Sequence, residues 1–271
     1  MRLPAEVAEV TGRFLELIDA SAPGLVQGLY LRGSLGFGEY FEGQSDVDFT
    51  LVMSARPDAD QLTALAAAHE AVFAARPKPH FDGFHVLRED LASAPDQCPD
   101  VPVMFDGVFK PGTRDYDMNP VSWHELARHG LTVRGPALSE REVWTDDAAL
   151  RAFSHGNLSS YWAGVADSLV KHPVEAGEPS LVAWSVLGVS RLHHLLATGT
   201  LTSKSGAGRY ALTAFGPQWH RIIRDALRAR ERPGDVSSYE DEPATRGRDT
   251  AAFTVMAVES GLALGPVAAG L

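Results

Sequence analysis

The sequence lacks the features that mark secreted and membrane proteins. Cys98 is the only cysteine among 271 residues, which excludes internal disulfides and a cysteine-based zinc site and fits a reducing cytoplasm. No run of about 18 apolar residues occurs, so we expect no membrane-spanning helix. The N-terminal segment carries acidic residues where a signal peptide needs an apolar stretch, so export is not expected. These absences together predict a cytoplasmic protein.

Basic charge is scarce, and the shortage lies in the first half of the chain. Residues 1–150 carry 24 Asp and Glu against 12 Lys and Arg, a net charge of −12, while residues 151–271 carry 11 against 12, a net charge of +1. Nucleic acid is therefore not expected as a ligand, because neutralising its phosphates requires a basic surface. An acidic half favours a cationic substrate or a bound metal, unless it is only a solvated surface that aids solubility.

Two common motifs for metals and nucleotides are also missing. His124, Glu125 and His129 are spaced one residue too far apart for a His-Glu-x-x-His zinc helix. No Gly-Lys-Ser/Thr follows the glycine-rich segment, which excludes a P-loop, and the glycines do not have the spacing of a dinucleotide-binding fingerprint.

Hydrophobic periodicity predicts an α+β first half and a helical second half. Helices are expected over residues 4–20, 58–75 and 119–130, and strands over residues 25–32, 47–53, 80–87 and 131–136. Later helices are expected over residues 147–170, 180–198, 205–229 and 247–262, with a polar loop over 230–248. The pattern predicts two domains, an α+β domain of residues 1–146 and a helical domain of residues 147–271.

The most informative stretch is residues 29–52, LYLRGSLGFGEYFEGQSDVDFTLV. A strand ends at Gly33-Ser34, where a glycine lets the backbone approach a phosphate and free N–H groups and a hydroxyl can bind it. Asp46 and Asp48 open the next strand and project from one face, since they are two residues apart. Their mutual repulsion favours Mg²⁺, a hard ion that shares carboxylates with phosphates. Gly-Ser alone is usually a turn and Asp-x-Asp alone a solvated strand end, but their combination predicts a nucleotide site.

A further acidic residue lies on a neighbouring predicted strand. Asp82 is the one acidic residue inside the predicted strand HFDGFHVL (residues 80–87). Acidic side chains are seldom placed inside a strand, so Asp82 is either a functional carboxylate or one satisfied by local hydrogen bonds.

Residues 29–52 resemble the polymerase-β-like nucleotidyltransferases, whose pattern is Gly-Ser, a short loop and Asp-x-Asp. Three later segments extend the resemblance to the bacterial aminoglycoside 3″-adenylyltransferases that act on streptomycin and spectinomycin. They are VFKPGTRDYD (108–117), LARHGLTVRGP (126–136) and SRLHHLLATGTLTSKSGAGRYAL (190–212). The resemblance covers about residues 30–215. It implies a polymerase-β-like domain with a mixed sheet and helices, followed by an α-helical bundle.

The resemblance also implies a nucleotide-binding set. Ser34 and Ser45 would contact the triphosphate beside Gly33. Lys204, from the helical domain, would contact the phosphates, and Arg191 lies where the family has an arginine on the preceding helix, which implies a nucleotide-binding or interdomain role.

The same family implies roles for the three carboxylates. Asp46 and Asp48 would be catalytic residues that bind Mg²⁺. Asp82 lies where the family has a glutamate that acts as general base for the acceptor hydroxyl. An aspartate is one methylene shorter, and a base must lie within hydrogen-bond reach of its proton, so Asp82 is either the general base or a further metal ligand.

The function implied is transfer of AMP from Mg-ATP to a hydroxyl of a small cationic acceptor, an aminoglycoside, as in antibiotic resistance. The segment 99–105 lacks the tryptophan that helps to hold streptomycin in the family. A different aminoglycoside, another alcohol or a protein hydroxyl therefore remain open as acceptors. A protein-modifying or toxin–antitoxin nucleotidyltransferase and a non-catalytic nucleotide-binding module are the alternatives. We expect a monomer with ATP and a small-molecule acceptor as its partners.

Overall fold

The computed structural model describes residues 3–114, 117–140 and 142–266. The chain divides into two compact units, residues 1–146 and residues 147–271. Among the described residues, no helix has both the length and the hydrophobicity that crossing a bilayer requires.

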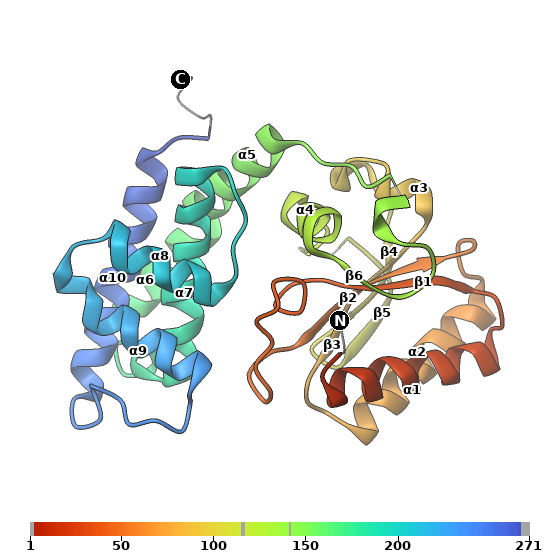
Figure 1. Ribbon diagram of the computed structural model, residues 1–271, viewed down its shortest axis with the longest axis horizontal. Helices are drawn as coiled ribbons and strands as arrows, with labels where there is room; N and C mark the ends of the chain where they lie inside the picture. Colours follow the sequence, from red (N-terminus) through yellow and green to blue (C-terminus); the bar gives the residue numbers. More distant parts are fainter. Residues whose placement is uncertain (1–2, 115–116, 141, 267–271) are drawn as a thin grey trace. The chain divides into compact units, whose positions relative to one another are not determined.

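The N-terminal unit is built on a mixed six-stranded sheet with the strand order β5-β4-β3-β2-β1-β6 (Figure 1). Strands β2 and β3 are parallel, and the other neighbouring pairs are antiparallel. The elements in chain order are α1 (Ala5–Ser21), β1 (Val26–Leu31), β2 (Val47–Met53), α2 (Ala59–Ala75), β3 (Phe81–Val86), α3 (Arg88–Leu91), β4 (Val101–Phe105), β5 (Val108–Thr113), α4 (Pro120–His129) and β6 (Leu131–Arg134). The predicted α+β class is confirmed.

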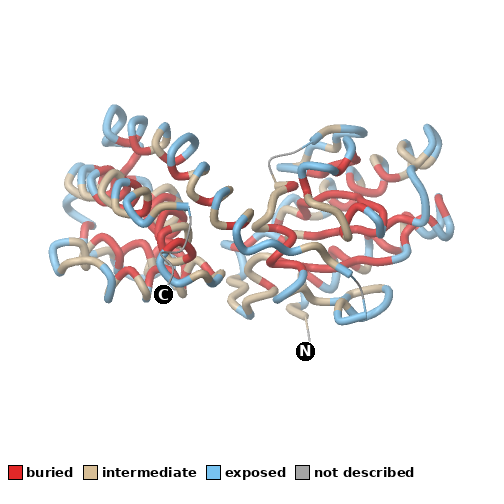
Figure 2. Tube along the Cα trace, turned by 90° about the horizontal axis from the view of Figure 1, so that it is seen from above, coloured by how far each residue is buried: buried red, intermediate tan, exposed pale blue. Residues whose placement is uncertain are grey.

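The sheet separates two apolar layers, because strand residues alternate between its faces. Phe49 of β2 packs with residues of α1 and α2, whereas Val52 of β2 packs on the opposite face with Trp123 of α4. Buried residues accordingly run along the strands in Figure 2. Cys98 is buried in the α4 layer, with 1% of its surface exposed. Asp48 and Val52 are an even number of positions apart in β2, so the side chain of Asp48 projects to the same face as that of Val52, the α4 side of the sheet.

Local sequence signals set the starts of two helices of this unit. Asp58 begins α2 with a capping box: its side chain accepts a hydrogen bond from the Gln61 N–H, and the Gln61 side chain accepts one from the Asp58 N–H. Asn119 caps α4, whose first residue is Pro120, and Gly130 follows its last residue. Both helices were predicted, over residues 58–75 and 119–130.

The β4–β5 hairpin was not predicted. Its two strands flank Asp106-Gly107, and both of these residues have positive φ angles, 49° and 76°. Asp-Gly is a preferred sequence for a two-residue hairpin turn. Pro102 and Pro111 obscured the strands, since proline is usually confined to sheet edges. Pro111 fits that rule, because β5 is an edge strand of the described sheet.

The C-terminal unit is helical. Its elements are α5 (Asp147–Asn157), a π-helical segment (Leu158–Trp162), α6 (Ala163–Lys171), α7 (Pro179–Thr198), α8 (Lys204–Ala214), α9 (His220–Glu231) and α10 (Pro243–Ala263). Helix α7 packs against α5, α8, α9 and α10. Buried side chains of α7, α9 and α10, such as Val186, Ile223 and Phe253, form one core.

Two helix boundaries in this unit differ from the prediction. The helix expected over residues 205–229 is two helices, α8 and α9, separated at Gly216-Pro217, because proline cannot continue a helix that would need its N–H. Helix α10 begins at Pro243, inside the segment expected to be a loop. Proline is favourable at the first position of a helix, where its missing N–H costs nothing.

Candidate active site

Gly33 lies in the turn after β1, directly against Asp48. Its φ angle is +60°, a conformation that glycine adopts without strain. A Cβ atom at this position would lie 2.1 Å from Oδ2 of Asp48. The Arg32 N–H donates a 3.0 Å hydrogen bond to the Asp48 carbonyl oxygen, which holds the turn against the start of β2. Any larger residue at position 33 would therefore displace the carboxylate.

Ser34 follows in the same turn, and its hydroxyl has no hydrogen-bond partner among the residues that the structure describes. Its Oγ is buried and forms no hydrogen bond with any described residue. The turn itself is closed by a hydrogen bond of 3.0 Å from the Glu39 N–H to the Ser34 carbonyl oxygen. An unsatisfied buried polar atom is costly, and a ligand oxygen bound here would remove that cost.

Asp48 and Asp82 are brought together by the parallel pairing of β2 and β3. The register pairs Asp48 with Asp82, so both side chains project from the same face of the sheet at adjacent positions. Asp46 lies two residues before Asp48, and half of its side chain is exposed. Its Oδ1 is 4.0 Å from the Nζ of Lys78. The structure thus pairs two of the three predicted carboxylates directly and places the third at the strand entrance.

Burial and mutual repulsion disfavour the charged forms of these two carboxyl groups. Burial raises the pKa of Asp48 to about 6, against the opposing charge of Arg32 and with support from Asp117, Glu125 and Asp46. Burial also raises the pKa of Asp82 to about 7, although a hydrogen bond from the Asp106 backbone opposes the rise. A bound cation would relieve this repulsion.

A complete protein cage for a metal is not present among the residues that the structure describes. No group of three or more His, Cys, Asp or Glu side chains is arranged there to hold a metal ion. Mg²⁺ is commonly held by one or two carboxylates together with substrate phosphates. The carboxyl groups of Asp48 and Asp82 repel each other and lie beside the Gly33 turn, so they fit this way of binding Mg²⁺. Metal binding by Asp46, Asp48 and Asp82 stays a prediction.

Asp82 is held by Asp106, which the sequence did not single out, and lies beside His80. The Asp106 N–H, at the tip of the β4–β5 hairpin, donates a 3.1 Å hydrogen bond to Oδ1 of Asp82. The Nδ1 of His80 lies 3.1 Å from Oδ1 of Asp106 and 3.9 Å from Oδ2 of Asp82. The dipeptide Asp106-Gly107 is a hairpin signal that could have revealed this turn.

Arg32 is a second residue that sequence analysis missed. It is only 3% exposed, its Nη2 donates a hydrogen bond to Oδ2 of Asp117, and its Nη1 lies 3.9 Å from Oε2 of Glu125. Burial lowers the pKa of its guanidinium, but the charges of Asp117, Asp48 and Glu125 outweigh burial and raise it overall. A buried arginine carries no sequence signal, because most arginines are exposed.

Ser45 is buried and shapes the loop before Asp46. Its Oγ accepts a 3.1 Å hydrogen bond from the Phe41 N–H, and its own N–H donates to the Phe41 carbonyl oxygen at 2.9 Å. The loop therefore delivers Asp46 and Asp48 to the strand start in a fixed conformation. The predicted contact of Ser45 with a triphosphate stays a prediction.

Arg191 and Lys204 both belong to the C-terminal unit, Arg191 in α7 and Lys204 at the start of α8. The Nε of Arg191, in α7, donates a 3.2 Å hydrogen bond to the Thr202 carbonyl oxygen. Ser203 caps α8 by accepting a 2.8 Å hydrogen bond from the Gly206 N–H, and Lys204 is the first residue of that helix. A helix N-terminus favours anions, which suits the predicted nucleotide-binding role of Lys204.

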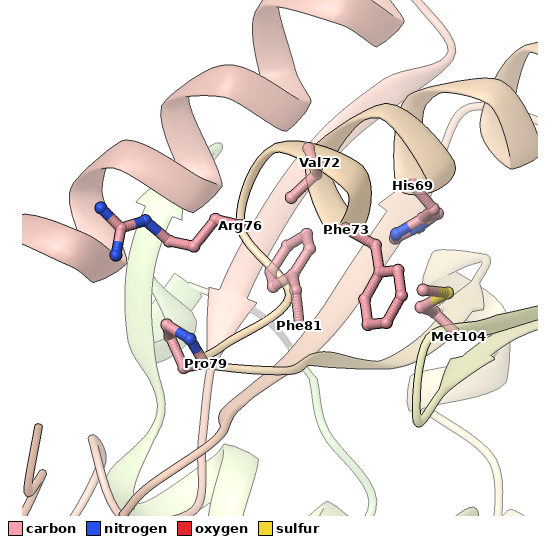
Figure 3. A pocket seen from close by; sticks show the side chains of 7 residues that line it. All are labelled: His69, Val72, Phe73, Arg76, Pro79, Phe81 and Met104. Carbon is pink, nitrogen blue, oxygen red and sulfur yellow. The ribbon is translucent and has the colours of Figure 1, made fainter. Parts of the chain in front are cut away.

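A small pocket lies on the α2 side of the sheet, the face opposite to Asp48 and Asp82 (Figure 3). It is lined mainly by apolar side chains, which include Val72, Phe73 and Met104, together with His69. None of the predicted site residues lines it. The pocket is therefore separate from the candidate active site.

Comparison with solved structures identifies the architecture. The chain is similar to the crystal structure of spectinomycin adenyltransferase AAD(9) from Enterococcus faecialis with ATP and spectinomycin, with a TM-score of 0.63 over 91% of this chain and 98% of that chain. It has an adenylyltransferase-like fold. The two sequences are 13% identical, so the likeness concerns the fold. The fold expected from the resemblance is thereby confirmed.

Sequence comparisons give no further relatives. No protein-family model matches the chain, and no curated protein sequence matches it.

Proposed function

We propose that this protein is a nucleotidyltransferase that transfers AMP from Mg-ATP to a hydroxyl of a small cationic acceptor, an aminoglycoside. The observation that carries the proposal is the register pairing of Asp48 with Asp82 on adjacent parallel strands, beside a Gly33-Ser34 turn that touches Asp48. The adenylyltransferase-like fold supports it, since the similar structure contains ATP and spectinomycin.

The nucleotide side of the proposed site is the turn after β1. The Ser34 Oγ, which has no partner among the described residues, would donate to a phosphate oxygen of ATP. Gly33 keeps the backbone close to that oxygen. Ser45, Arg191 and Lys204 complete the proposed set of nucleotide-binding residues.

The proposed metal ligands are Asp46 and Asp48, with Asp82 at their side. The chemistry that a bound Mg²⁺ supplies is neutralisation of the negative charge on the phosphate oxygens. The position of Asp48 depends on Gly33, because the missing side chain at residue 33 leaves room for its carboxylate.

Asp82 is the proposed general base. Its carboxylate accepts the proton of the acceptor hydroxyl, the hydroxyl oxygen forms a bond to the α-phosphorus, and the bond to the leaving pyrophosphate breaks. A base with a pKa near the working pH combines a large deprotonated fraction with useful basicity. The pKa of Asp82, raised by burial to about 7, suits this role.

The negative charge of the first half of the chain supports a cationic acceptor. The first 150 residues carry a net charge of −12, and Glu39, Glu42 and Asp46 lie in or beside the loop that carries the carboxylates. Such a surface attracts ammonium groups and repels anionic acceptors.

The proposal is tested by turnover with ATP, Mg²⁺ and a panel of aminoglycosides, read as pyrophosphate release and as the mass of the adenylylated acceptor. We expect Asp48→Asn and Asp82→Asn each to lower kcat by at least about 100-fold, the usual effect of losing a central charged or general-base group. Asp100→Asn, at an exposed acid outside the site, is the matched control and should retain full activity.

Other outcomes would point elsewhere. AMP transfer by Asp48→Asn at a rate near that of the wild type would contradict the site assignment. Labelling of a co-purified protein by ATP, with no small acceptor used, would favour a protein-modifying enzyme. ATP binding without any transfer would favour a non-catalytic nucleotide-binding module.

A further inference from the structure

Three chain segments converge on the Asp82 carboxylate. The entrance of β2 lies beside it, because the parallel register pairs Asp48 with Asp82. The tip of the β4–β5 hairpin reaches it through the Asp106 N–H, 3.1 Å from Oδ1 of Asp82. The His80 imidazole completes the arrangement, with Nδ1 3.1 Å from Asp106 and 3.9 Å from Asp82. Asp82 is thus held from the hairpin tip and flanked by the residue that enters its own strand.

We propose that Asp106 and His80 form a clamp that fixes the orientation of the Asp82 carboxylate for proton transfer from the acceptor. Both are positioning residues, because they act on the acceptor through Asp82. This inference rests on the proposed function and adds to it the residues that set the acceptor side of the site.

Asp106 makes contacts with Asp82 and His80 that a two-residue hairpin turn does not require. A two-residue turn with both residues at positive φ accounts for Asp106-Gly107 as a connection. It does not require the first turn N–H to point at a third strand, nor the Asp106 carboxylate to lie against His80. Asp106 is also the one residue other than glycine with a positive φ in the described part of the chain.

The hairpin tip is seated firmly enough to act as a clamp. A Cβ atom at Gly107 would lie 2.6 Å from Cζ of Phe73 in α2, so the turn packs directly on that ring. The His80 ring lies beside the same phenylalanine, with ring centroids 6.1 Å apart. Helix α2 therefore supports both members of the clamp.

Asp82 has particular need of such support. An aspartate has a shorter reach than a glutamate, so its carboxylate must be delivered close to the acceptor hydroxyl. A misplacement of about 1 Å at a reacting group can cost about 100-fold in rate. The hydrogen bond from Asp106 and the adjacent imidazole restrict the rotation of this short side chain.

Three variants separate the clamp from the turn. Asp106→Asn keeps the positive φ preference, the N–H and a side-chain oxygen for His80. Asp106→Gly keeps the turn and the N–H but removes the contact with His80. His80→Phe keeps a ring against Phe73 and removes Nδ1.

We expect Asp106→Gly and His80→Phe to lower kcat for acceptor adenylylation about 10- to 100-fold, with KM for ATP within twofold of the wild type. Asp106→Asn should restore kcat to within about threefold. A merely structural role would not produce this split between kcat and KM, nor the rescue by asparagine. Circular dichroism and thermal unfolding verify that each variant folds.

Amide hydrogen exchange at residue 106, followed by NMR, tests the clamp without turnover. The Asp106 N–H should exchange at least about tenfold faster in Asp82→Ala and in His80→Phe than in the wild type, and at the wild-type rate in Asp106→Asn. Unchanged exchange in Asp82→Ala, or full kcat in both Asp106→Gly and His80→Phe, overturns the clamp. If exchange responds as expected while the wild type transfers AMP to no acceptor, the clamp stands and the proposed function fails.

Discussion

The ionised form of Asp82 destabilises the folded protein when no metal is bound. Its pKa is raised from the ordinary value of 3.8 to about 7, so the folded chain holds the proton that the unfolded chain has already released. Between pH 4 and 7 the folded state binds more protons than the unfolded state. Stability therefore falls as the pH rises through this window.

Asp82→Asn should stabilise the metal-free protein. The amide keeps an oxygen for the Asp106 N–H and carries no charge, so the free energy of unfolding at pH 8 should rise by about 2–4 kcal/mol. Urea denaturation in EDTA at pH 4 and pH 8 measures the effect, and the gain should vanish at pH 4. An equal stability of variant and wild type at pH 8 would show that Asp82 is not held against ionisation.

The sequence singles out candidate site residues but not the partners that hold them. Gly33, Ser34, Asp46 and Asp48 stand out because Gly-Ser and Asp-x-Asp occur together around one loop, and Asp82 stands out as an acidic residue inside a strand. Such local patterns can be recognised in the sequence alone. The partners that orient these residues come from distant positions along the chain. No pattern in the sequence links Asp82 to a backbone N–H 24 residues later, because that contact depends on how β3 and β4 pair.

At the scale of elements, β3 and α2 are joined by two buried histidines. The Nε2 atoms of His69 and His85 are 3.0 Å apart, and Nδ1 of His85 is 2.8 Å from the Pro102 carbonyl oxygen. A carbonyl only accepts hydrogen bonds, so Nδ1 of His85 carries its proton and its Nε2 accepts from His69. Phe14 and Phe49 surround His69. The pair is neutral in an apolar layer.

This pair should make the protein acid-sensitive. Burial lowers the pKa of His85 to about 4 and lowers that of His69 well below 6.5. Only the unfolded chain takes up these protons as the pH falls from about 6.5 towards 4, so stability is lost in that window. The expected loss from His85 alone is about 3 kcal/mol.

Urea unfolding at pH 7.0 and pH 4.5 tests this expectation with the double variant His69→Phe/His85→Leu. The variant should lose less stability between the two pH values than the wild type, whatever its stability at pH 7.0. His172→Gln, at an exposed histidine, is the control and should keep the wild-type difference. An unchanged pH difference in the double variant would exclude the pair as the source of acid sensitivity.

Element prediction succeeded where local chemistry decides the structure. The capping box at Asp58 and the Asn119-Pro120 start fix α2 and α4 without reference to the rest of the fold. It failed where neighbours decide. Strand β4 contains Pro102 and is a strand because β3 and β5 pair with it. The hydrophobic residues keep one helical periodicity across residues 205–229, which concealed the break at Pro217.

At the scale of the whole molecule, charge is the property that the sequence states most directly. The net charge of the chain is −11, of which residues 1–150 contribute −12 and residues 151–271 contribute +1. A surface of one sign raises the local concentration of oppositely charged ligands, and salt screens that effect. Acceptor capture should therefore depend on ionic strength.

For a polycationic aminoglycoside acceptor, kcat/KM should fall about tenfold when salt rises from roughly 10 mM to roughly 100 mM, since the screening length shrinks from ~30 Å to ~10 Å. Initial rates at subsaturating acceptor and saturating ATP measure this. Sucrose at matched osmolality is the control and should leave the rate unchanged. A value of kcat/KM that does not change with salt would show that the acidic surface does not attract the acceptor.

The single cysteine has a practical consequence for chemical labelling. Cys98 is buried, and burial raises the pKa of its thiol to about 11, so little reactive thiolate exists at neutral pH. A cysteine introduced at an exposed position, such as Val236→Cys in the helical unit, would be the dominant site for a maleimide dye or a spin label. Fluorescence and electron paramagnetic resonance experiments on this chain could begin without first removing the native thiol.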